Sequence, residues 1–515
     1  RETLLSSRRH PRAATSELRM RAMQSFHDRV HGEMSFRAYT AKMTHSAAIL
    51  RLDRVRQLGA CAFVFPSATH TRREHSLGVA HLASKMGNHL HALRPDLVSE
   101  DDLLCLELAG LFHDLGHGPF SHTFESYMHQ AAERLVSETK GEEADAVASW
   151  SHERMSVALA ESSMRSEPED PFEGDYEANL RFVKLLIMGL DDGDPWPSDC
   201  GRGVDKRFLL GVVHDRTAGV DVDKLDYLIR DSLTIFGTSY PLNVPRLLGS
   251  LRLVDEAAHP KVSFDASVAL EISEVYALRA RMHRTVYQHP EVLLAETRLL
   301  ERMHAYDAAA AAPLWRRALT PHSFLELTED LLLSAMSDVR SLYGLCSVPR
   351  SRNAVKIRTL PRCTGCGCET ELCSAFCHSC GRPTENRVGI MGRDRCLVAP
   401  EGSITSERAT REVRTRANAM LIVCITDVHC GKGVPVVDPH GRKWRDYDPL
   451  RRILFVDSAG RRVEVSSDSQ GAPQVRHVRY ARCYLMGDEA SNRRAERAFA
   501  EWGAEVGILE EREIS

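Results

Sequence analysis

The sequence predicts a mainly α-helical protein with a small zinc-ribbon insertion and an α+β C-terminal lobe. Three observations predict this fold class. Apolar residues recur at helical spacing over most of the region from Phe26 to Gly344. Cysteine, glycine, arginine and proline then break the pattern between Ser347 and Asp394, and short β-like apolar runs follow. The expected organisation is a flexible basic leader at 1–24, a helical domain at 25–346, the insertion at 347–395 and the lobe at 396–515.

Within the helical domain, the clearest element is a helix that begins after Ser99. Ser99 and Asp102 form a plausible capping box, and leucines follow at positions 103, 104, 106, 108 and 111. The cluster of Gly116, Gly118 and Pro119 should end this helix. Apolar periodicity predicts further helices near 75–94, 144–163, 221–233 and 267–288, the last ending before Pro290.

The C-terminal lobe combines β-like runs with one helix. The runs cover 420–428, 453–456 and 463–465, and a helix is expected near 489–502.

Bulk composition is that of an ordinary globular protein. A chain of 515 residues should form two or three folded units. The net charge of −4 argues against a nucleic-acid binder as a whole, although a local basic face stays open. No apolar run is long enough to span a bilayer, and the arginine-rich start lacks the apolar core of a signal peptide. We therefore expect an intracellular protein, cytoplasmic or nuclear, without a membrane partner. Because residue 1 is not Met, the natural N-terminus is left open.

The strongest chemical signal is the string LFHDLGHGPFSH at residues 111–122. His113 and Asp114, adjacent at a helix end, can offer an imidazole and a carboxylate to one cation. Two further candidate ligands are His75, in TRREHSLG, and Asp223, in GVDVDKLDY. A mixed shell of this kind suits Fe, Mn or Zn and leaves positions for water, whose pKa a cation can lower towards ~7. For any single one of the 24 histidines a solvated surface position is the better interpretation, but the ordered set favours a metal site.

These residues carry a family resemblance. His75, His113-Asp114 and Asp223 match the H…HD…D signature of the HD phosphohydrolase superfamily. The longer strings HDLGHGPFSH and DVDKLDY resemble the dNTP triphosphohydrolases of that superfamily, although no segment resembling a sterile alpha motif is present. The resemblance runs from about Phe26 to near Glu505 and is interrupted by the cysteine-rich stretch. It implies an all-helical HD-domain core with a C-terminal regulatory lobe.

The resemblance implies a role for each matching residue. The implied metal ligands are His75, His113, Asp114 and Asp223. The implied catalytic residues are His117, His152 and Glu153, with His122 placed to protonate the departing 5′ oxygen. The implied reaction is attack of a metal-activated water on the α-phosphorus of a dNTP, which yields a deoxynucleoside and inorganic triphosphate. Mg²⁺ is implied on the substrate phosphates. A solvated surface turn is the alternative interpretation for His152-Glu153, although its order and spacing favour the catalytic role.

Two stripes of polar residues are candidates for substrate contacts. Asp223, Tyr227 and Asp231 are spaced i, i+4, i+8 on one helix face, with Lys224 on its flank, and Arg279, His283 and Tyr287 repeat this spacing. Such stripes are by themselves more often salt-bridge faces than ligand sites. The resemblance implies phosphate contacts for Arg72, Lys224 and Arg279, and sugar contacts for Gln57 and Asp231. It implies that Leu58 and Tyr287 crowd the 2′ position and so reject ribonucleotides.

Regulation is where the sequence departs from the family pattern. Animal members become active when guanine nucleotides and dNTPs bridge subunits into a tetramer. His45 and Asp53 stand where an Asp and an Arg read guanine, and Asp265 and Ser267 stand where an Arg and a Lys hold the second effector. The loss of positive charge argues against the same effector chemistry. We expect a homo-oligomer, dimer or tetramer, and leave a nucleotide effector open.

The cysteines predict a second metal site. Six of the 14 lie between Cys363 and Cys380, where two C-x-x-C-G knuckles are separated by ten residues. Four thiolates at this spacing can hold structural zinc in a minimal ribbon, and the ligands would be Cys363, Cys366, Cys377 and Cys380. Cys368 and Cys373 are extra thiols, so another ligand choice or a redox role stays open. Arginines 350, 352, 358 and 362 also leave open nucleic-acid or partner binding, or a solvated linker.

Two other functions compete with dNTP hydrolysis. Another HD-type nucleotide phosphohydrolase or phosphodiesterase would keep the metal ligands but should lack the set formed by Arg72, Lys224, Tyr227 and Arg279. A non-catalytic nucleic-acid-binding scaffold would keep the fold alone. The intact metal and acid–base positions argue against the scaffold, whereas the ribbon and the basic leader favour it modestly.

Overall fold

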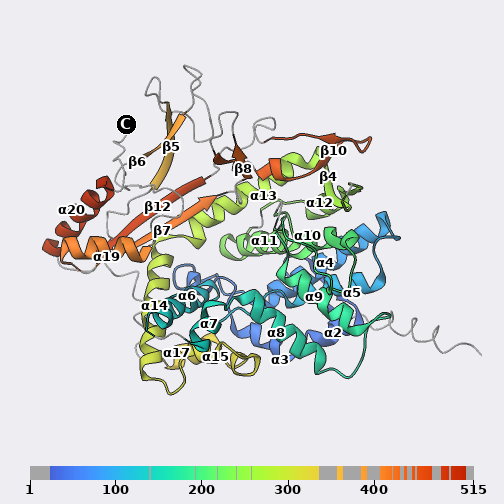
Figure 1. Ribbon diagram of the computed structural model, residues 1–515, viewed down its shortest axis with the longest axis horizontal. Coiled ribbons are helices and arrows are strands. Elements are labelled where there is room, and N and C mark those ends of the chain that lie inside the picture. Colours follow the sequence, from blue (N-terminus) through green and yellow to red (C-terminus); the bar gives the residue numbers. More distant parts are fainter. Residues whose placement is uncertain are drawn as a thin grey trace, which may run out of the picture. The chain divides into compact units, whose positions relative to one another are not determined.

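The computed structural model describes most of the first two thirds of the chain and several segments after it (Figure 1). The described residues are 24–335 apart from 139–140, 192, 217–218, 239 and 257, followed by 357–363, 384–390, 406–419, 421–429, 434–437, 443–446, 449–466, 477–485 and 489–505. Helices dominate them, so the predicted mainly α fold class is confirmed.

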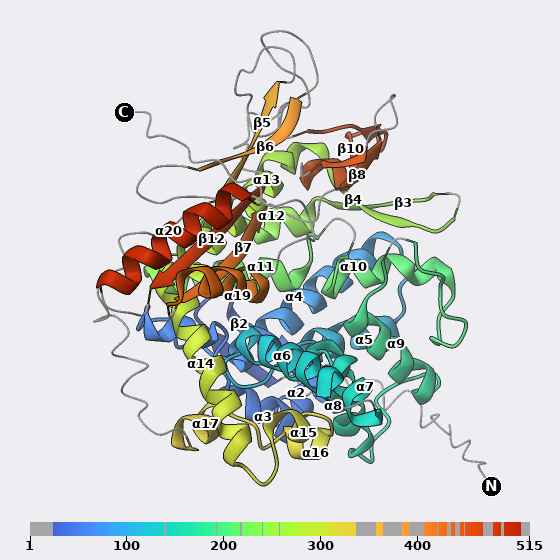
Figure 2. The ribbon, with the colours of Figure 1, turned by 60° about the vertical axis from the view of Figure 1, so that its left-hand side comes forward.

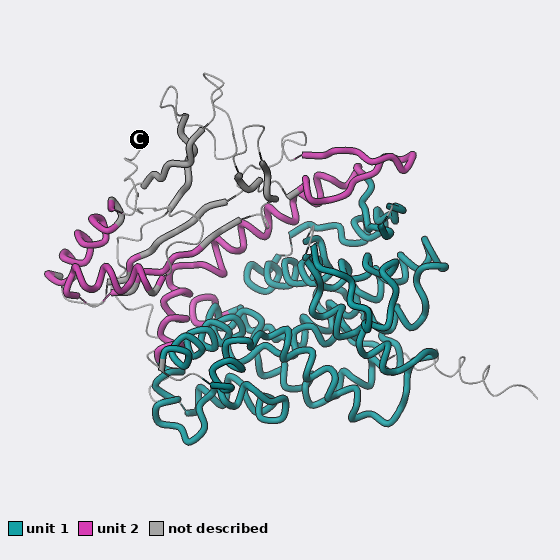
Figure 3. The backbone as a smooth tube through the Cα atoms, in the orientation of Figure 1, with its two compact units in different colours: residues 1–62, 67–265, 302–337 teal, residues 63–66, 266–301, 338–515 magenta. Residues whose placement is uncertain are grey.

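The chain divides into two compact units (Figure 3). The first unit comprises residues 1–62, 67–265 and 302–337, and the second comprises 63–66, 266–301 and 338–515. Neither unit is continuous along the chain, whereas the domains expected from the sequence follow each other in linear order. The expected domain boundaries therefore stay predictions.

The first unit is helical. Its helices are α2 (Ala38–Met43), α3 (Ala47–Arg51), α4 (Arg72–Leu93), α5 (Glu100–Phe112), α6 (His122–Glu138), α7 (Glu142–Ala148), α8 (His152–Arg165), α9 (Tyr176–Met188), α10 (Leu210–Val213), α11 (Val222–Phe236), α12 (Val244–Gly249), α15 (Leu314–Arg317), α16 (Pro321–Phe324) and α17 (Glu329–Ala335). Helix α14 (Pro290–Ala309) begins in the second unit and ends in the first.

Helix α5 is the centre of this unit. Every residue from Asp102 to Phe112 is buried, and α4, α8 and α9 contact the helix (Figure 2). The predicted capping box is present, because Ser99 accepts from the backbone N–H of Asp102 and Asp102 accepts from that of Ser99. Because neighbouring helices cover this helix on all sides, its C-terminal end at His113 is held in one place.

The predicted helix at 144–163 is wrong as a single element. The structure has α7 and α8 there, separated at residues 149–151. Ser151 takes an extended conformation and its side chain accepts from the backbone N–H of Arg154, so it begins a new helix at His152. The predicted helices near 75–94 and 221–233 are confirmed as α4 and α11, within a few residues at their ends.

Two antiparallel hairpins in the first unit were not predicted. Strands β1 (Gln24–Asp28) and β2 (Gly32–Phe36) pair from Gln24↔Phe36 to Asp28↔Gly32. Strands β3 (Leu251–Val254) and β4 (Lys261–Asp265) form the other hairpin. Strands of four or five residues leave too short an alternation to stand out in a helical background.

The second unit contains helices and paired strands. Helix α13 (Ala269–Met282) continues into a π-helical turn, η5 (His283–Tyr287), so the predicted helix at 267–288 changes its period near its end. The strand pairs are β5 (Ile357–Cys363) with β6 (Thr384–Ile390), β7 (Leu421–His429) with β12 (His477–Leu485), β8 (Val434–Val437) with β9 (Lys443–Asp446) and β10 (Phe455–Val456) with β11 (Arg462–Val463). Helix α19 (Ser406–Ala417) packs against β7 and against α20 (Glu489–Glu505).

Most of the expected zinc ribbon lies outside the described residues. Cys363 ends strand β5, and nothing is described of its side chain. Cys366, Cys377 and Cys380 lie outside the described residues, as do 1–23 of the expected leader. The ribbon and its zinc therefore stay predictions. Among the described helices, none combines the length and the hydropathy that crossing a membrane requires.

Candidate metal and catalytic site

The four predicted metal ligands lie together in the first unit. Nε2 of His75 lies 3.1 Å from Oδ1 of Asp223 and 3.5 Å from Oδ2 of Asp114. Nε2 of His113 lies 3.3 Å from Nε2 of His75, 3.4 Å from Oδ1 of Asp114 and 3.8 Å from Oδ1 of Asp223. Residues from α4, from the end of α5 and from the first turn of α11 therefore converge on one point.

Local structure orients two of the predicted ligands, His113 and Asp223. Nδ1 of His113 donates to the carbonyl oxygen of Gly110 at 2.8 Å, so its Nε2 is free to face the cluster. Asp221 caps α11, accepting from the backbone N–H of Lys224 at 2.9 Å, and this places Asp223 in the first turn.

The donor set fits a first-row divalent cation. Ligand atoms about 2.1 Å from a shared ion lie about 3.0–3.4 Å apart at octahedral or tetrahedral angles. The atoms of His75, His113, Asp114 and Asp223 are separated by 3.1 to 3.8 Å, so small adjustments suffice. Two imidazoles and two carboxylates are the mixed shell that Fe, Mn and Zn accept.

Electrostatics favour the same interpretation. Burial by itself lowers the pKa of His75, but hydrogen bonds to Asp223 and Asp226 outweigh burial and raise this pKa to about 10. Burial raises the pKa of Asp114, whereas the charges of Arg72 and His113 hold it well below its usual range. Both carboxylates of the ligand set are ionised at neutral pH, as ligation requires. These two ionised carboxylates would attract a cation.

The predicted catalytic residues adjoin the metal ligands. Nε2 of His117 lies 3.4 Å from Oδ1 of Asp114, and its buried ring stacks on His152 with centroids 4.2 Å apart. The ring of His122 lies 5.1 Å from that of His117, and its side chain is 71% exposed. Oε2 of Glu153 lies 3.6 Å from Nδ1 of His152. The predicted ligands and the predicted acid–base residues thus form one continuous cluster that reaches solvent at His122.

Close backbone packing builds this cluster. A Cβ on Gly116 would lie 1.9 Å from the carbonyl oxygen of His152, so only glycine lets the start of α8 approach the segment after α5. Phe120 and Ser121 have φ of 63° and 54°, a left-handed conformation that costs energy for both residue types. The chain turns sharply there and begins α6 at His122.

A family model described as HD domain matches residues 72–183. The chain contains an HD domain. The matched segment contains His75, His113 and Asp114 together with all four predicted catalytic residues, whereas Asp223 lies beyond it.

The HD-domain chain is also similar to curated deoxynucleoside triphosphate triphosphohydrolases. It is 33% identical to SAMHD1 of Mus musculus over 349 residues, which are 62% of this chain and 51% of that protein. It is 31% identical to SAMHD1 of Gallus gallus over 57% of this chain and 48% of that protein. It is 26% identical to a putative HD domain-containing protein of Acanthamoeba polyphaga mimivirus over 60% of this chain and 63% of that protein. The HD-domain chain spans about half the length of the two SAMHD1 proteins.

Two of the predicted phosphate contacts, Arg72 and Lys224, have partners of their own near the predicted metal ligands. Buried Arg72 donates from Nη1 to Oδ2 of Asp114 at 2.5 Å and from Nη2 to the carbonyl oxygen of Gln57 at 3.2 Å. Nζ of Lys224 lies 2.8 Å from Oδ2 of Asp221. Arg72 and Lys224, the two cations predicted to contact phosphate in this unit, thus each pair with a carboxylate in the structure.

The remaining substrate candidates divide between the two units. Leu58, Tyr227 and Asp231 belong to the first unit, where buried Asp231 accepts from Nε2 of His70 at 2.7 Å. In the second unit, Arg279 lies on α13, and His283 and Tyr287 lie in η5 with ring centroids 5.0 Å apart. The contacts of these residues with a substrate stay predictions.

Sequence reasoning missed Glu125, which lies on α6. Its Oε1 accepts from Nδ1 of His152 at 2.9 Å, and its Oε2 lies 3.4 Å from Nδ1 of His122. The spacing of three between His122 and Glu125 at a helix start could have indicated this pair, but nothing in the sequence indicates the contact with His152. Burial raises the pKa of Glu125, but both imidazoles hold it far below its usual range, so Glu125 is ionised.

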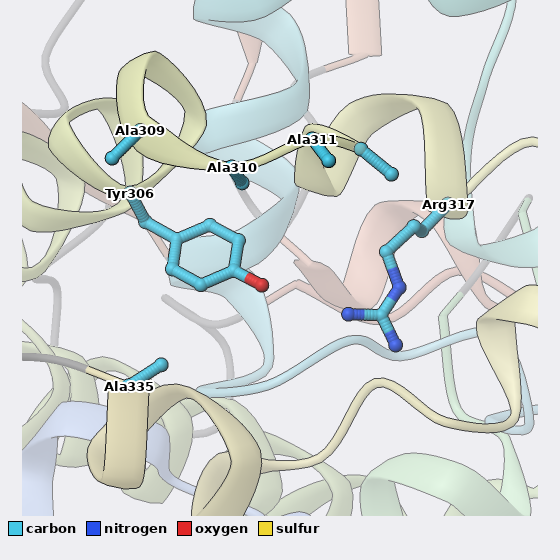
Figure 4. Close-up of a pocket in the computed structure, with 7 residues that line it drawn as sticks. Tyr306, Ala309, Ala310, Ala311, Arg317 and Ala335 are labelled. Carbon is cyan, nitrogen blue, oxygen red and sulfur yellow. The ribbon is translucent and has the colours of Figure 1, made fainter.

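A cavity of about 440 Å³ lies elsewhere in the first unit, where α14 ends (Figure 4). It is lined by Tyr306, Ala309, Ala310, Ala311, Ala312, Arg317 and Ala335. No predicted site residue lines it, and its alanine-rich wall offers a single charged group. We assign no role in catalysis to this cavity.

Proposed function

We propose that the protein hydrolyses deoxynucleoside triphosphates to a deoxynucleoside and inorganic triphosphate. The observation that carries the proposal is the convergence of His75, His113, Asp114 and Asp223 next to the cluster of His117, His122 and His152. The SAMHD1 relatives are deoxynucleoside triphosphate triphosphohydrolases, and this activity supplies the substrate class.

The proposed metal is one first-row divalent ion, Fe, Mn or Zn, with Mg²⁺ on the substrate phosphates. When bound, the first-row ion supplies Lewis acidity and lowers the pKa of a water, so that attack on the α-phosphorus becomes feasible at neutral pH. Nε2 of His75 and Nε2 of His113 would be its nitrogen ligands, and the carboxylates of Asp114 and Asp223 its oxygen ligands.

The acid–base work falls to the residues next to the ligands. His122, exposed at the start of α6, donates a proton to the departing 5′ oxygen, and its Nδ1 lies 3.4 Å from Oε2 of Glu125. Glu125 also binds His152, and burial lowers the pKa of His152 while Glu125 raises it above its usual value. His117 has its pKa lowered well below the usual range by burial and by Arg72, so it acts as a neutral imidazole.

Phosphate binding uses cations that are already paired. In the structure Arg72 pairs with Asp114 and Lys224 pairs with Asp221. A bound polyphosphate must therefore either displace these carboxylates from the two cations or bind the cations alongside them. In our proposal Arg279 is the third phosphate contact, Gln57 and Asp231 bind the sugar, and Leu58 and Tyr287 crowd its 2′ position. Tyr227 and His283 are the remaining proposed substrate contacts.

Assembly and regulation are further parts of the proposal. We expect a homo-oligomer, dimer or tetramer, and an intracellular location, cytoplasmic or nuclear. At the positions where the family reads guanine, Asp53 pairs with Arg73 at 3.3 Å and Nδ1 of His45 lies 3.2 Å from the carbonyl oxygen of Ala41. His45 and Asp53 differ from the Asp and Arg that read guanine in the family, so we do not expect the same effector chemistry and leave another nucleotide effector open.

Product analysis tests the proposal. Purified protein is incubated with each dNTP and NTP in Mn²⁺ and Mg²⁺, with a His113→Ala/Asp114→Ala double variant as control. We expect a deoxynucleoside and intact triphosphate from the wild type and nothing from the variant. Orthophosphate or a monophosphate would instead favour another HD-type phosphohydrolase or phosphodiesterase. Bound metal without turnover of any nucleotide would favour a nucleic-acid-binding scaffold.

A further inference from the structure

Asp226 lies behind the metal ligands and contacts one of them directly. Its Oδ2 accepts from Nδ1 of His75 at 2.7 Å, and both side chains are buried. Because a carboxylate only accepts at neutral pH, this bond places the proton of His75 on Nδ1. A bound metal would take the place of the proton on Nε2 of the same ring, which faces Asp114, Asp223 and His113.

Asp226 is itself held from two directions. Arg230, one helical turn later on α11, donates from Nε to Oδ2 and from Nη2 to Oδ1, each at 2.9 Å. Nε2 of His31 binds Oδ1 at 2.6 Å from the turn of the β1–β2 hairpin. The carboxylate therefore has partners on both oxygens and cannot rotate without breaking several hydrogen bonds.

The hairpin also holds the arginine. Asp28 accepts from Nη1 of Arg230 at 2.7 Å, and its Oδ1 accepts from the backbone N–H groups of Val30 and His31 at 2.8 and 2.9 Å. One short turn thus orders both its own histidine and the arginine of α11. Arg230 and Asp226 are fully buried, so losing a partner would leave a charge without compensation.

Helix α4 leaves room for this group at a glycine. A Cβ on Gly78 would lie 2.0 Å from Oδ1 of Asp226 and 2.5 Å from Nη2 of Arg230. Gly78 is three residues after His75 on α4, so the same helix supplies the ligand and the space for the group behind it.

We propose that Asp226 is a positioning residue for the metal, and that the β1–β2 hairpin contributes through His31 and Asp28. The inference rests on the proposed metal centre and deepens it. Asp226 fixes the tautomer and the ring orientation of His75, and Arg230, His31 and Asp28 fix Asp226. A histidine whose second nitrogen donates to a carboxylate is a stronger and better oriented ligand than an unsupported one. The N-terminal hairpin, which contributes no ligand, thereby raises metal affinity.

Metal affinity is the measurement that tests this. Mn²⁺ is titrated calorimetrically into chelator-stripped full-length protein, well below the melting temperature of each variant. We expect Asp226→Asn to bind Mn²⁺ about 10- to 100-fold more weakly than the wild type, the range for a residue that supports a metal ligand. His31→Ala should show a smaller weakening, about threefold or more, because it acts through Asp226.

Asp102→Asn is the matched control. Asp102 is a buried carboxylate on α5 that accepts from Nε of Arg202 at 2.6 Å and from Nζ of Lys206 at 2.7 Å, outside the site. Its loss should lower the melting temperature but leave Mn²⁺ affinity unchanged. A general loss of packing would weaken Mn²⁺ binding in the control as well, and would overturn the proposal.

Each remaining outcome also bears on the positioning role of Asp226 or on the proposed reaction. Unchanged Mn²⁺ affinity in folded Asp226→Asn overturns the proposal. If this variant does not fold, His31→Ala decides, and unchanged affinity there overturns the role of the hairpin and of Asp226. A wild type that binds no Mn²⁺ removes both the metal centre and the positioning role. A wild type that binds Mn²⁺ but hydrolyses no dNTP removes the proposed reaction alone.

Discussion

The imidazole of His117 stacks on that of His152, with ring centroids 4.2 Å apart and planes 21° apart. His117 follows the metal-ligand pair at the end of α5, whereas His152 begins α8, so the contact joins two elements that are 35 positions apart in the chain. Burial and Arg72 lower the pKa of His117, whereas Glu125 raises that of His152. Of the two stacked imidazoles, His117 therefore favours the neutral form and His152 the protonated form. Such a difference between neighbouring groups suits acid–base chemistry.

Glu125→Gln should lower turnover and shift its pH dependence. Without the carboxylate the pKa of His152 falls, so the alkaline limb of the kcat profile moves to lower pH. We expect kcat to fall about 10²-fold while metal content stays at one ion per chain. An unchanged profile in a folded variant would show that Glu125 has only a structural role.

Glu329 predicts a pH dependence of stability. Burial raises its pKa to about 7, although Arg56 and the backbone N–H groups of Arg56 and Phe120 oppose the rise. The pKa of Glu329 is higher in the folded state than in the unfolded state, so protonated Glu329 contributes to folding stability. This stability is fully present below the unfolded pKa of 4.5 and is lost as pH rises to about 7. The loss should reach about 3 kcal/mol. Urea titrations at several pH values should show a flatter profile for Glu329→Gln, and parallel profiles would contradict the assignment.

Removal of the metal should destabilise the HD domain. An ion that binds only the folded state adds RT ln(1 + [L]/Kd), about 2.7 kcal/mol at 100 times Kd. Stripping the protein with a chelator should lower its melting temperature, and Mn²⁺ should restore it. His113→Ala/Asp114→Ala should melt at one temperature whether or not Mn²⁺ is added. A response of this variant equal to that of the wild type would place the ion elsewhere.

Gly116→Ala should separate α8 from the segment that carries His113 and Asp114. The added Cβ would lie 1.9 Å from a backbone oxygen of His152, so backbone has to move. We expect a loss of about 2–4 kcal/mol in stability and of most activity. Gly249→Ala is the matched control, because nothing lies within 4 Å of its Cβ position. Similar melting temperatures for both variants would show that α8 tolerates displacement.

The sequence predicts what depends on local chemistry. The capping box at Ser99 and Asp102 is local, and the end of α5 at His113 follows from the glycines beyond it. The predicted metal ligands came from an ordered set of His and Asp residues and from a family resemblance, and the structure brings all four together. The break between α7 and α8 is a local signal that was overlooked, because Ser151 opens a helix as readily as Ser99 does.

The groups behind the site could not be predicted in this way. His31 and Asp226 are 195 positions apart, and neither sequence neighbourhood indicates the other. The role of Glu125 requires that α6 and α8 bring it to His152, which depends on the packing allowed by Gly116. Such contacts arise from the tertiary arrangement, whereas periodicity and capping report only on single elements.

The return of the chain to the first unit after residue 301 sets the order in which this unit can be completed during synthesis. Nε1 of Trp150 donates to the carbonyl oxygen of Ala318 at 3.1 Å, and Nε of Arg51 donates to that of Leu327 at 2.9 Å. These buried groups find their partners only after Ala318 and Leu327 have left the ribosome. A nascent chain that ends near residue 265 carries every proposed metal ligand, but Trp150 and Arg51 still lack these partners. We therefore expect chaperone binding to persist until α17 has emerged.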